Sequence, residues 1–549
     1  MVPCTCPERR EFDGTKRARG YGRRETRSGR LELNYDGPAT GVARMTATHT
    51  NARSRLDVVV MRGFLWTSGG RLIVQLATWV VSLTIARILS PRDYGIAAMA
   101  ALYIGFAQLL AELGIGAAIV QRTNLPKPLV ASLTGVSLVM GVVLALVSVP
   151  AGYALAAFYK EPILVAVVAV YGLNFIPTAF RSVSAALLSK EMAFGKVTML
   201  ALIEAVSASL ISLMLALAGW SVWALVLGNV AAVSLAALVA VMWAPPGFSL
   251  DVGRLRGTGV LTFGYKVLVQ RSAWYLYAST DFLIIGRLIG TAALGQYNLA
   301  YQFASIPAER ITGALTQVLF PVFATLQRNA VELARYFRHA TEACMLVLMP
   351  VYIGLALVAF DLIDVALGVK WRGAAPIVVV LALAAVVRAA ASVANTAIIS
   401  AGNAGFGARM SVIGLIVFPP SFLIASQTRW GAAAVGAVWL LLYPPVIAIP
   451  TIAVALRYTS MSVAEYFGAI KPALWSTLVM AMAVYAVQQA TAEANTLLRL
   501  AFAVATGAAT YGVMLLVFFR DRVQRYVSLA SRGVGSGGGE GARALGETA

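Results

Sequence analysis

The feature that most constrains this chain is its succession of apolar stretches, each long enough to cross a lipid bilayer. A helix needs about 20 apolar residues to span the hydrocarbon core, and fourteen runs of roughly that length follow residue 61. The runs cover residues 66–89, 94–116, 129–150, 162–188, 197–218, 221–243, 260–288, 293–320, 340–360, 374–400, 409–426, 431–456, 471–490 and 495–519. Runs of this length fit helices, in which every backbone group is satisfied internally. The pattern therefore predicts an all-α integral membrane protein with about 14 transmembrane helices.

Composition agrees with a membrane protein and argues against a nucleic-acid partner. Only 12% of the residues are charged and 59% are hydrophobic, whereas soluble domains carry about 25% charged residues. The formal net charge is +20, but basic cytoplasmic loops and a basic N-terminal tail account for most of it. The two histidines, His49 and His339, and three cysteines offer no metal-binding spacing. We expect no metal and no cofactor.

The distribution of loop charge predicts the orientation in the membrane. Alternate loops and the C-terminal tail carry sixteen Lys and Arg residues, and the opposite loops carry six. Basic loops stay on the cytoplasmic side. Both termini are therefore expected in the cytoplasm, which agrees with an even number of spans.

An internal repeat relates the two halves of the chain. Arg62–Ala100 aligns without a gap on Thr262–Ala300, which pairs Arg71 with Arg271, Arg87 with Arg287 and Gly95 with Gly295. Arginine is rare inside membranes, so the two arginine pairs carry most of the weight. Six helices separate the copies, so both copies start on the same side, as in transporters built from parallel repeats.

The repeat predicts a division of the chain. We expect two six-helix bundles, residues 61–258 and 259–456, followed by helices 13 and 14 in residues 457–520. Residues 521–549 are Gly-rich and read as a disordered tail. Residues 1–60 read either as a disordered basic tail or as an over-extended start, with translation beginning at Met45 or Met61.

Several segments resemble one family of membrane transporters. In the first half these are ARILSPRDYGIAAMA (Ala86–Ala100), LLAELGIGAAIVQR (Leu109–Arg122) and ALLSKEMAFGK (Ala186–Lys196). In the second half they are DFLIIGRLIGTAALGQYNLAYQFASIP (Asp281–Pro307) and LTQVLFPVFATLQ (Leu315–Gln327). The chain resembles Wzx-type lipid-linked oligosaccharide flippases of the polysaccharide transport group. Their superfamily also holds multidrug and peptidoglycan-precursor exporters.

The resemblance implies a fold, a substrate and a location. It implies two pseudo-symmetric six-helix bundles around a central cationic cavity that works by alternating access. The substrate would be a polyprenyl-pyrophosphate-linked oligosaccharide, moved across the bacterial inner membrane for exopolysaccharide, O-antigen or capsule synthesis. Membrane lipids, a polysaccharide polymerase and export machinery are the candidate partners.

Basic residues inside the apolar runs are candidates for binding the pyrophosphate, because the guanidinium fork matches phosphate oxygens. The substrate-binding candidates are Arg71, Arg87, Lys266, Arg271, Arg287, Arg181 and Arg388. Arg71, Lys266 and Arg271 are expected toward the cytoplasmic side, and Arg87 and Arg287 near the far ends of their helices. For Arg87 and Arg287 the alternative is that they snorkel to lipid head groups or cap a turn.

Acidic residues in the same regions leave two interpretations open. Glu112, Asp281 and Glu309 either carry a coupling proton or form static internal ion pairs. Asp281 lies six residues from Arg287, which puts the two on different faces of one helix, so its partner is expected on another helix. Tyr265, Trp274, Tyr275 and Tyr277 crowd the seventh helix; they could stack on sugars, but an interface belt is the favoured interpretation.

Rival functions fit the sequence less well. A membrane glycan polymerase or glycosyltransferase usually needs a large extramembrane loop or an acidic metal motif, and this chain has no Asp-x-Asp. A multidrug-type cation antiporter needs an acidic pocket, whereas the repeat here is cationic. The sequence therefore predicts a flippase and not an enzyme.

Overall fold

The structure is a computed structural model that describes residues 77–112, 115–121, 126–251, 272, 275–326 and 329–520. These residues belong to one compact unit, Met61–Ser536. In the described part of the chain the regular structure is entirely helical, as predicted.

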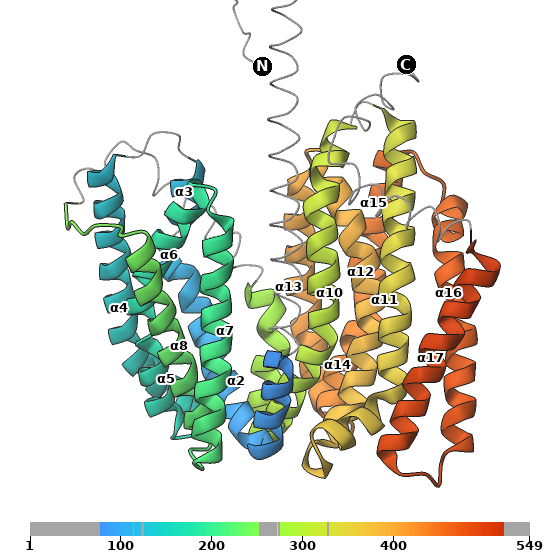
Figure 1. The fold of residues 1–549 in the computed structure, drawn as a ribbon, viewed down its shortest axis with the longest axis horizontal. Helices are drawn as coiled ribbons and strands as arrows, with labels where there is room; N and C mark the ends of the chain where they lie inside the picture. Colours follow the sequence, from blue (N-terminus) through green and yellow to red (C-terminus); the bar gives the residue numbers. More distant parts are fainter. Residues whose placement is uncertain are drawn as a thin grey trace, which may run out of the picture. The chain divides into compact units, whose positions relative to one another are not determined.

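The first half of the described chain forms one group of helices (Figure 1). Its first described residues, Ala77–Ile88, are helical. The helices that follow are α2 (Pro91–Glu112), α3 (Ile115–Gln121), α4 (Lys127–Tyr159), α5 (Leu164–Gly172), α6 (Phe175–Lys190), α7 (Phe194–Leu217) and α8 (Val222–Trp243). Within this group α4 packs against α5 and α6, and α8 packs against α6 and α7.

The second half forms a second group, which begins with a helix over residues 275–284 that continues into the π-helix η2 (Ile285–Ile289). The next elements are α10 (Thr291–Thr325), α11 (Ala330–Ala366), the 3₁₀ turn η3 (Val369–Trp371), α12 (Ala374–Ser400) and α13 (Ala404–Ser426). The last elements are α14 (Ala432–Tyr443), the π-helix η4 (Pro444–Ala448), α15 (Ile449–Thr459), α16 (Val463–Ala490) and α17 (Thr496–Phe518). Here α12 packs against α10, α11 and α14.

The apolar helices lie where the sequence predicts membrane spans, but fewer of them qualify as spans than the fourteen predicted. Among the described residues, eleven helices are long and apolar enough to cross a membrane. Of the other three predicted runs, 66–89 and 260–288 are described only in part, and α10 is not among the eleven. The chain is therefore a multi-pass membrane protein, and the count of fourteen stays a prediction.

Two helices begin well before their predicted starts. α11 begins at Ala330 and not near residue 340, because the Asn329 side chain caps it by accepting a hydrogen bond from the Glu332 amide at 3.2 Å. α16 begins at Val463 and not near residue 471, because Ser462 and Glu465 form a reciprocal capping box. Such caps satisfy the free amides of a helix start. Hydropathy alone does not detect polar turns of this kind.

The two repeats meet where α2 crosses α10, and two glycines make the crossing possible. A Cβ atom added to Gly95 would lie 1.8 Å from the Thr291 carbonyl oxygen, and one added to Gly295 would lie 1.8 Å from the Pro91 carbonyl oxygen. Residues 91 and 291 and residues 95 and 295 are equivalent in the predicted repeat. Each copy therefore makes the same contact with the other, as a pseudo-two-fold axis requires.

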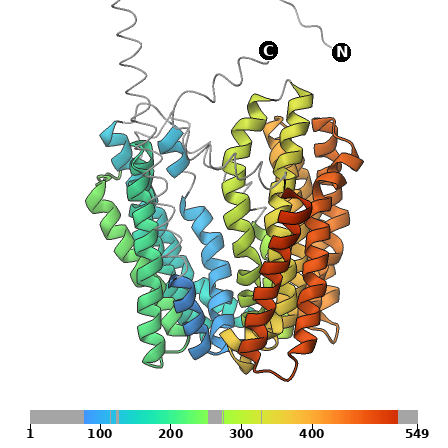
Figure 2. The same ribbon diagram turned by 45° about the vertical axis from the view of Figure 1, so that its right-hand side comes forward.

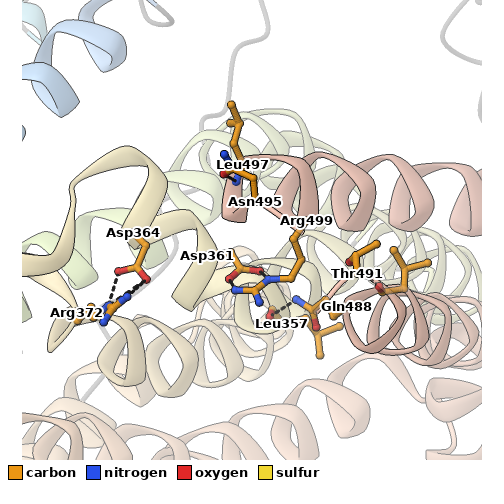
Figure 3. A network of polar contacts seen from close by, with 10 residues as sticks. Leu357, Asp361, Asp364, Arg372, Gln488, Thr491, Asn495, Leu497 and Arg499 are labelled. Carbon is orange, nitrogen blue, oxygen red and sulfur yellow. Dashed lines mark hydrogen bonds and ion pairs between the residues drawn. The ribbon is translucent and has the colours of Figure 1, made fainter. Parts of the chain in front are cut away.

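Helices α16 and α17 are fastened to the second group by polar contacts. Asp361 on α11 forms an ion pair with Arg499 on α17, in which Arg499 Nε lies 2.8 Å from the carboxylate (Figure 3). Gln488 Nε2 on α16 donates to the Leu357 carbonyl at 3.0 Å. Figure 2 shows α16 and α17, in red, beside α11, against which both pack.

Substitution of Gly295 should disrupt the crossing severely. In Gly295→Ala the new methyl group meets a backbone carbonyl that cannot rotate away, so we expect a loss of about 3 kcal/mol or more of unfolding free energy. Gly313→Ala, on the same helix with no atom within 4 Å of its added Cβ, should change stability by less than about 1 kcal/mol. Thermal unfolding of the purified variants in detergent measures both. Equal melting temperatures for the two variants would contradict the proposed close approach.

Candidate functional site

A cavity of about 540 Å³ lies between the two repeats. Its walls come from the helix Ala77–Ile88, α2, α5, α7 and α8 on one side, and from the helix over residues 275–284 and α10 on the other. A cavity this size is within the usual range for small-ligand sites. Polar lining groups include Ser209 and Asn229 from the first half and Asn298 and Gln302 from the second.

Equivalent positions of the two repeats face each other across the cavity. Four pairs of equivalent positions line it: Ser82 and Phe282, Ala98 and Asn298, Ala101 and Tyr301, and Leu102 and Gln302. The same offset of 200 residues relates the glycines at the α2–α10 crossing. The repeat found in the sequence therefore builds both the crossing and the cavity.

One end of the α2–α10 crossing is closed by a clamp from η3. Lys370 Nζ donates to the carbonyl oxygens of Arg87, Ile88 and Leu89 at 2.7, 3.2 and 2.7 Å. The buried Trp371 donates through Nε1 to the Ala86 carbonyl at 2.9 Å. These contacts satisfy carbonyls at the end of Ala77–Ile88 and join the second half of the chain to the first.

Glu161, between α4 and α5, adds a second link at this end. Its carboxylate accepts hydrogen bonds from Arg92 of α2 at 2.8 Å and from Thr291 of α10 at 2.6 Å. Partial burial by itself raises the pKa of Glu161, but the hydrogen bonds from Thr291 and Arg92 outweigh burial and the pKa is lowered. A lowered carboxyl pKa stabilises the fold above the ordinary Glu pKa, and this contribution is lost as the pH falls through the lowered value.

The basic residues predicted to bind substrate fall in several environments. Arg87 is exposed, and the Arg287 guanidinium lies 5.6 Å from the centre of the Phe158 ring. Arg181 forms an ion pair with Glu204 at 2.8 Å, and Arg388 lies 5.5 Å from the centre of the Trp439 ring. None of these four lines the 540 Å³ cavity. Arg71, Lys266 and Arg271 lie outside the described residues, so a binding role for the set stays a prediction.

The buried Asp281 is the centre of a polar cluster in the second half. It is fully buried and accepts hydrogen bonds from Tyr297 on α10 at 2.6 Å and Trp439 on α14 at 2.9 Å. The Phe282 amide donates to its other oxygen at 2.9 Å. As predicted, its side-chain partners come from other helices, but both of these donors are neutral. Trp439 also links this cluster to Arg388, whose guanidinium lies 5.5 Å from the centre of the Trp439 ring.

The other two acidic candidates are less informative. Glu309 on α10 is exposed, and the side chain of Glu112 lies outside the described part of the chain. A coupling or ion-pair role for either residue therefore stays a prediction.

The aromatic residues of the seventh predicted helix point into the protein where they are described. Tyr277 is 8% exposed and packs edge-on against Phe418 and Trp439. Tyr275 lines the cavity and donates to the Leu102 carbonyl at 3.0 Å. The predicted interface belt is wrong for these two residues, because both hydroxyl-bearing rings contact neighbouring helices. Tyr265 and Trp274 lie outside the described residues.

Sequence reasoning missed the neutral residues that line the cavity. Asn229, Asn298 and Gln302 carry no charge, and only charges were distinctive against so apolar a background. The repeat alignment contained a usable signal, because Asn298 and Gln302 replace Ala98 and Leu102 at equivalent positions.

Substitutions of Asp281 separate its hydrogen bonds from its charge. Asp281→Asn keeps one acceptor oxygen, so we expect a loss of about 1 kcal/mol of unfolding free energy. Asp281→Leu leaves Tyr297 and Trp439 without an acceptor and should cost about 3 kcal/mol or more. Thermal unfolding measures stability, and a transport assay of Asp281→Asn tests the coupling role. If Asp281→Asn is stable but inactive, the carboxylate charge is required; if it is active, the coupling role is excluded.

Comparison with known proteins gives the relatives of this chain. Residues 84–376 match the model of a family described as polysaccharide biosynthesis protein. The chain is 26% identical to the teichuronic acid biosynthesis protein TuaB of Bacillus subtilis, over 83% of this chain and 95% of that one. It is 25% identical to the succinoglycan biosynthesis transport protein ExoT of Rhizobium meliloti, over 81% of this chain and 90% of that one.

The fold is also found among solved structures. The lipid II flippase MurJ, in an inward closed conformation, matches with a TM-score of 0.65 and 11% identity, over 82% of this chain and 99% of that one. At this identity the likeness concerns the fold alone, and it confirms the predicted all-α membrane architecture. The family match spans more than half of the chain and confirms the resemblance seen in the sequence. The chain belongs to the polysaccharide biosynthesis protein family.

Proposed function

We propose that this protein is a flippase that moves a polyprenyl-pyrophosphate-linked oligosaccharide across the bacterial inner membrane. The single observation that carries the proposal is a cavity built by equivalent positions of two repeats, in a chain of the polysaccharide biosynthesis family. A cavity on a pseudo-two-fold relation can open to either side when the halves rock against each other. The glycan would serve exopolysaccharide, O-antigen or capsule synthesis.

The closed end of the crossing supports alternating access. Lys370, Trp371 and Glu161 tie the two halves together on one side of the cavity through hydrogen bonds of 2.6 to 3.2 Å. With both termini in the cytoplasm, this side would be periplasmic. The structure would then represent a state closed to the periplasm, and breaking these contacts would be part of the opening step.

Arg71, Lys266 and Arg271 remain our candidates for holding the pyrophosphate. Their proposed role rests on the repeat, on the chemistry of phosphate recognition, and on their expected place toward the cytoplasmic side. A lipid-linked anion enters from that leaflet.

The multidrug antiporter has less support. Such a protein binds organic cations and needs acidic side chains in its cavity, but none of the described lining residues is acidic.

A glycan polymerase or a polysaccharide export complex is a candidate partner that would take up the flipped substrate.

A deletion strain tests the function. We expect deletion to trap lipid-linked repeat units in the cytoplasmic leaflet, and the wild-type gene to restore their release. Arg271→Ala should fail to restore release at normal protein abundance, because it removes a proposed phosphate ligand. The matched control is Arg335→Ala, which removes an exposed arginine 3.7 Å from Glu332 and should restore release.

Three outcomes of this experiment would contradict the account. Flipped but unpolymerised repeat units in the deletion strain would support a polymerase instead. Unchanged surface glycan in the deletion strain would contradict the proposed substrate. Full release with Arg271→Ala would exclude that residue from the path.

A further inference from the structure

We propose that the cavity between the repeats binds the sugar part of the substrate, with Asn298 and Gln302 of α10 and Asn229 of α8 as residues that determine glycan specificity. This inference rests on the proposed flippase function and deepens it. It assigns separate places to the glycan and to the pyrophosphate of one substrate.

The walls contributed by the two repeats differ in chemistry. At equivalent lining positions the first repeat supplies Ala98 and Leu102, and the second supplies Asn298 and Gln302. In the described part of the chain, neither amide is hydrogen-bonded to another residue. Each can therefore offer one carbonyl oxygen and one NH₂ group to a ligand. At these two equivalent positions the symmetry-related backbones thus carry amides in the second repeat and apolar side chains in the first.

Asn229 faces the cavity from the opposite side and is held by a neighbour. Asn174 donates through Nδ2 to Asn229 Oδ1 at 2.9 Å. This bond occupies the Asn229 oxygen and leaves the Asn229 NH₂ group for a ligand. A fixed donor on one wall and two amides on the other can hydrogen-bond to hydroxyl groups at particular positions of a sugar, and so distinguish one sugar from another.

The described lining suits the sugar part of the substrate better than the pyrophosphate. None of the described lining residues is charged. Removing a pyrophosphate from water without a cationic partner is costly, whereas sugar hydroxyls need only neutral donors and acceptors. Tyr171 and Tyr301 also line the cavity, and rings of this kind can pack against the apolar face of a sugar.

A binding experiment with two natural probes tests the inference. The probes are the lipid-linked repeat unit extracted from the deletion strain and the bare polyprenyl pyrophosphate, each titrated onto purified protein in lipid nanodiscs. The test variant is Asn298→Ala with Gln302→Leu, which copies the first repeat onto the second. We expect about tenfold weaker binding of the repeat unit, from the loss of two hydrogen bonds, and unchanged binding of the bare lipid.

Two further variants complete the design. Leu299→Met copies the equivalent buried residue Met99 at a position outside the cavity lining, and it should leave both affinities unchanged. Asn229→Ala, on the opposite wall, should weaken binding of the repeat unit alone.

The outcomes separate this inference from the function on which it rests. Two results, if seen in both the double variant and Asn229→Ala, would overturn the glycan site. One is an equal effect on the binding of both probes, and the other is no effect on the binding of the repeat unit. Either result would leave the proposed flippase function in place. Wild-type protein that binds neither probe would overturn the proposed function and the inference with it.

Discussion

The contact between α2 and α10 is the constraint on which the rest of the structure depends. Backbone atoms of the two helices approach so closely that a methyl group at Gly95 or Gly295 would lie 1.8 Å from a carbonyl oxygen of the other helix. Small residues allow membrane helices to pack at this separation, where van der Waals contact replaces the hydrophobic effect. Because the contact repeats under the pseudo-two-fold axis, the crossing can serve as a pivot for both halves. The cavity and the clamp formed by Lys370 and Trp371 both lie against these helices.

The two halves share a backbone plan but differ in what they bury. The second half holds Asp281 with Tyr297 and Trp439 in its interior, and the equivalent positions 81 and 97 of the first half are Val and Ala. Tyr301 and Phe282 line the cavity, and Phe282 packs edge-on against both Tyr301 and Tyr297, the residue that donates to Asp281. The buried Asp281 cluster of the second half therefore packs directly behind the cavity wall. At the equivalent lining positions 98 and 102 the first half instead presents Ala and Leu.

The fold could be predicted from the sequence to a large extent. Long apolar runs located the helices, and the register of Arg87 with Arg287 and Gly95 with Gly295 identified the repeat that the α2–α10 crossing follows. Helix starts at Ala330 and Val463 were not predicted, because caps by Asn329 and Ser462 are local polar features that hydropathy averages away.

The site was harder to predict for a physical reason. Charges stand out in an apolar sequence, so the sequence predicts Arg181 as a cavity residue, whereas in the structure it pairs with Glu204. Neutral amides such as Asn298 and Gln302 attract no notice until the fold brings them to one wall. A residue's neighbours on other helices decide whether its polarity serves a ligand or an internal bond, and a single sequence does not contain those neighbours.

Reconstitution tests the central claim most directly. Purified protein is inserted into liposomes that carry the extracted lipid-linked repeat unit in both leaflets, and a glycosidase that cannot cross the membrane is added outside. A flippase brings repeat units from the inner leaflet to the outer one, so we predict that nearly all of the glycan becomes cleavable. If only the outer half is cleaved, as in protein-free liposomes, the protein does not flip this lipid and the account is wrong.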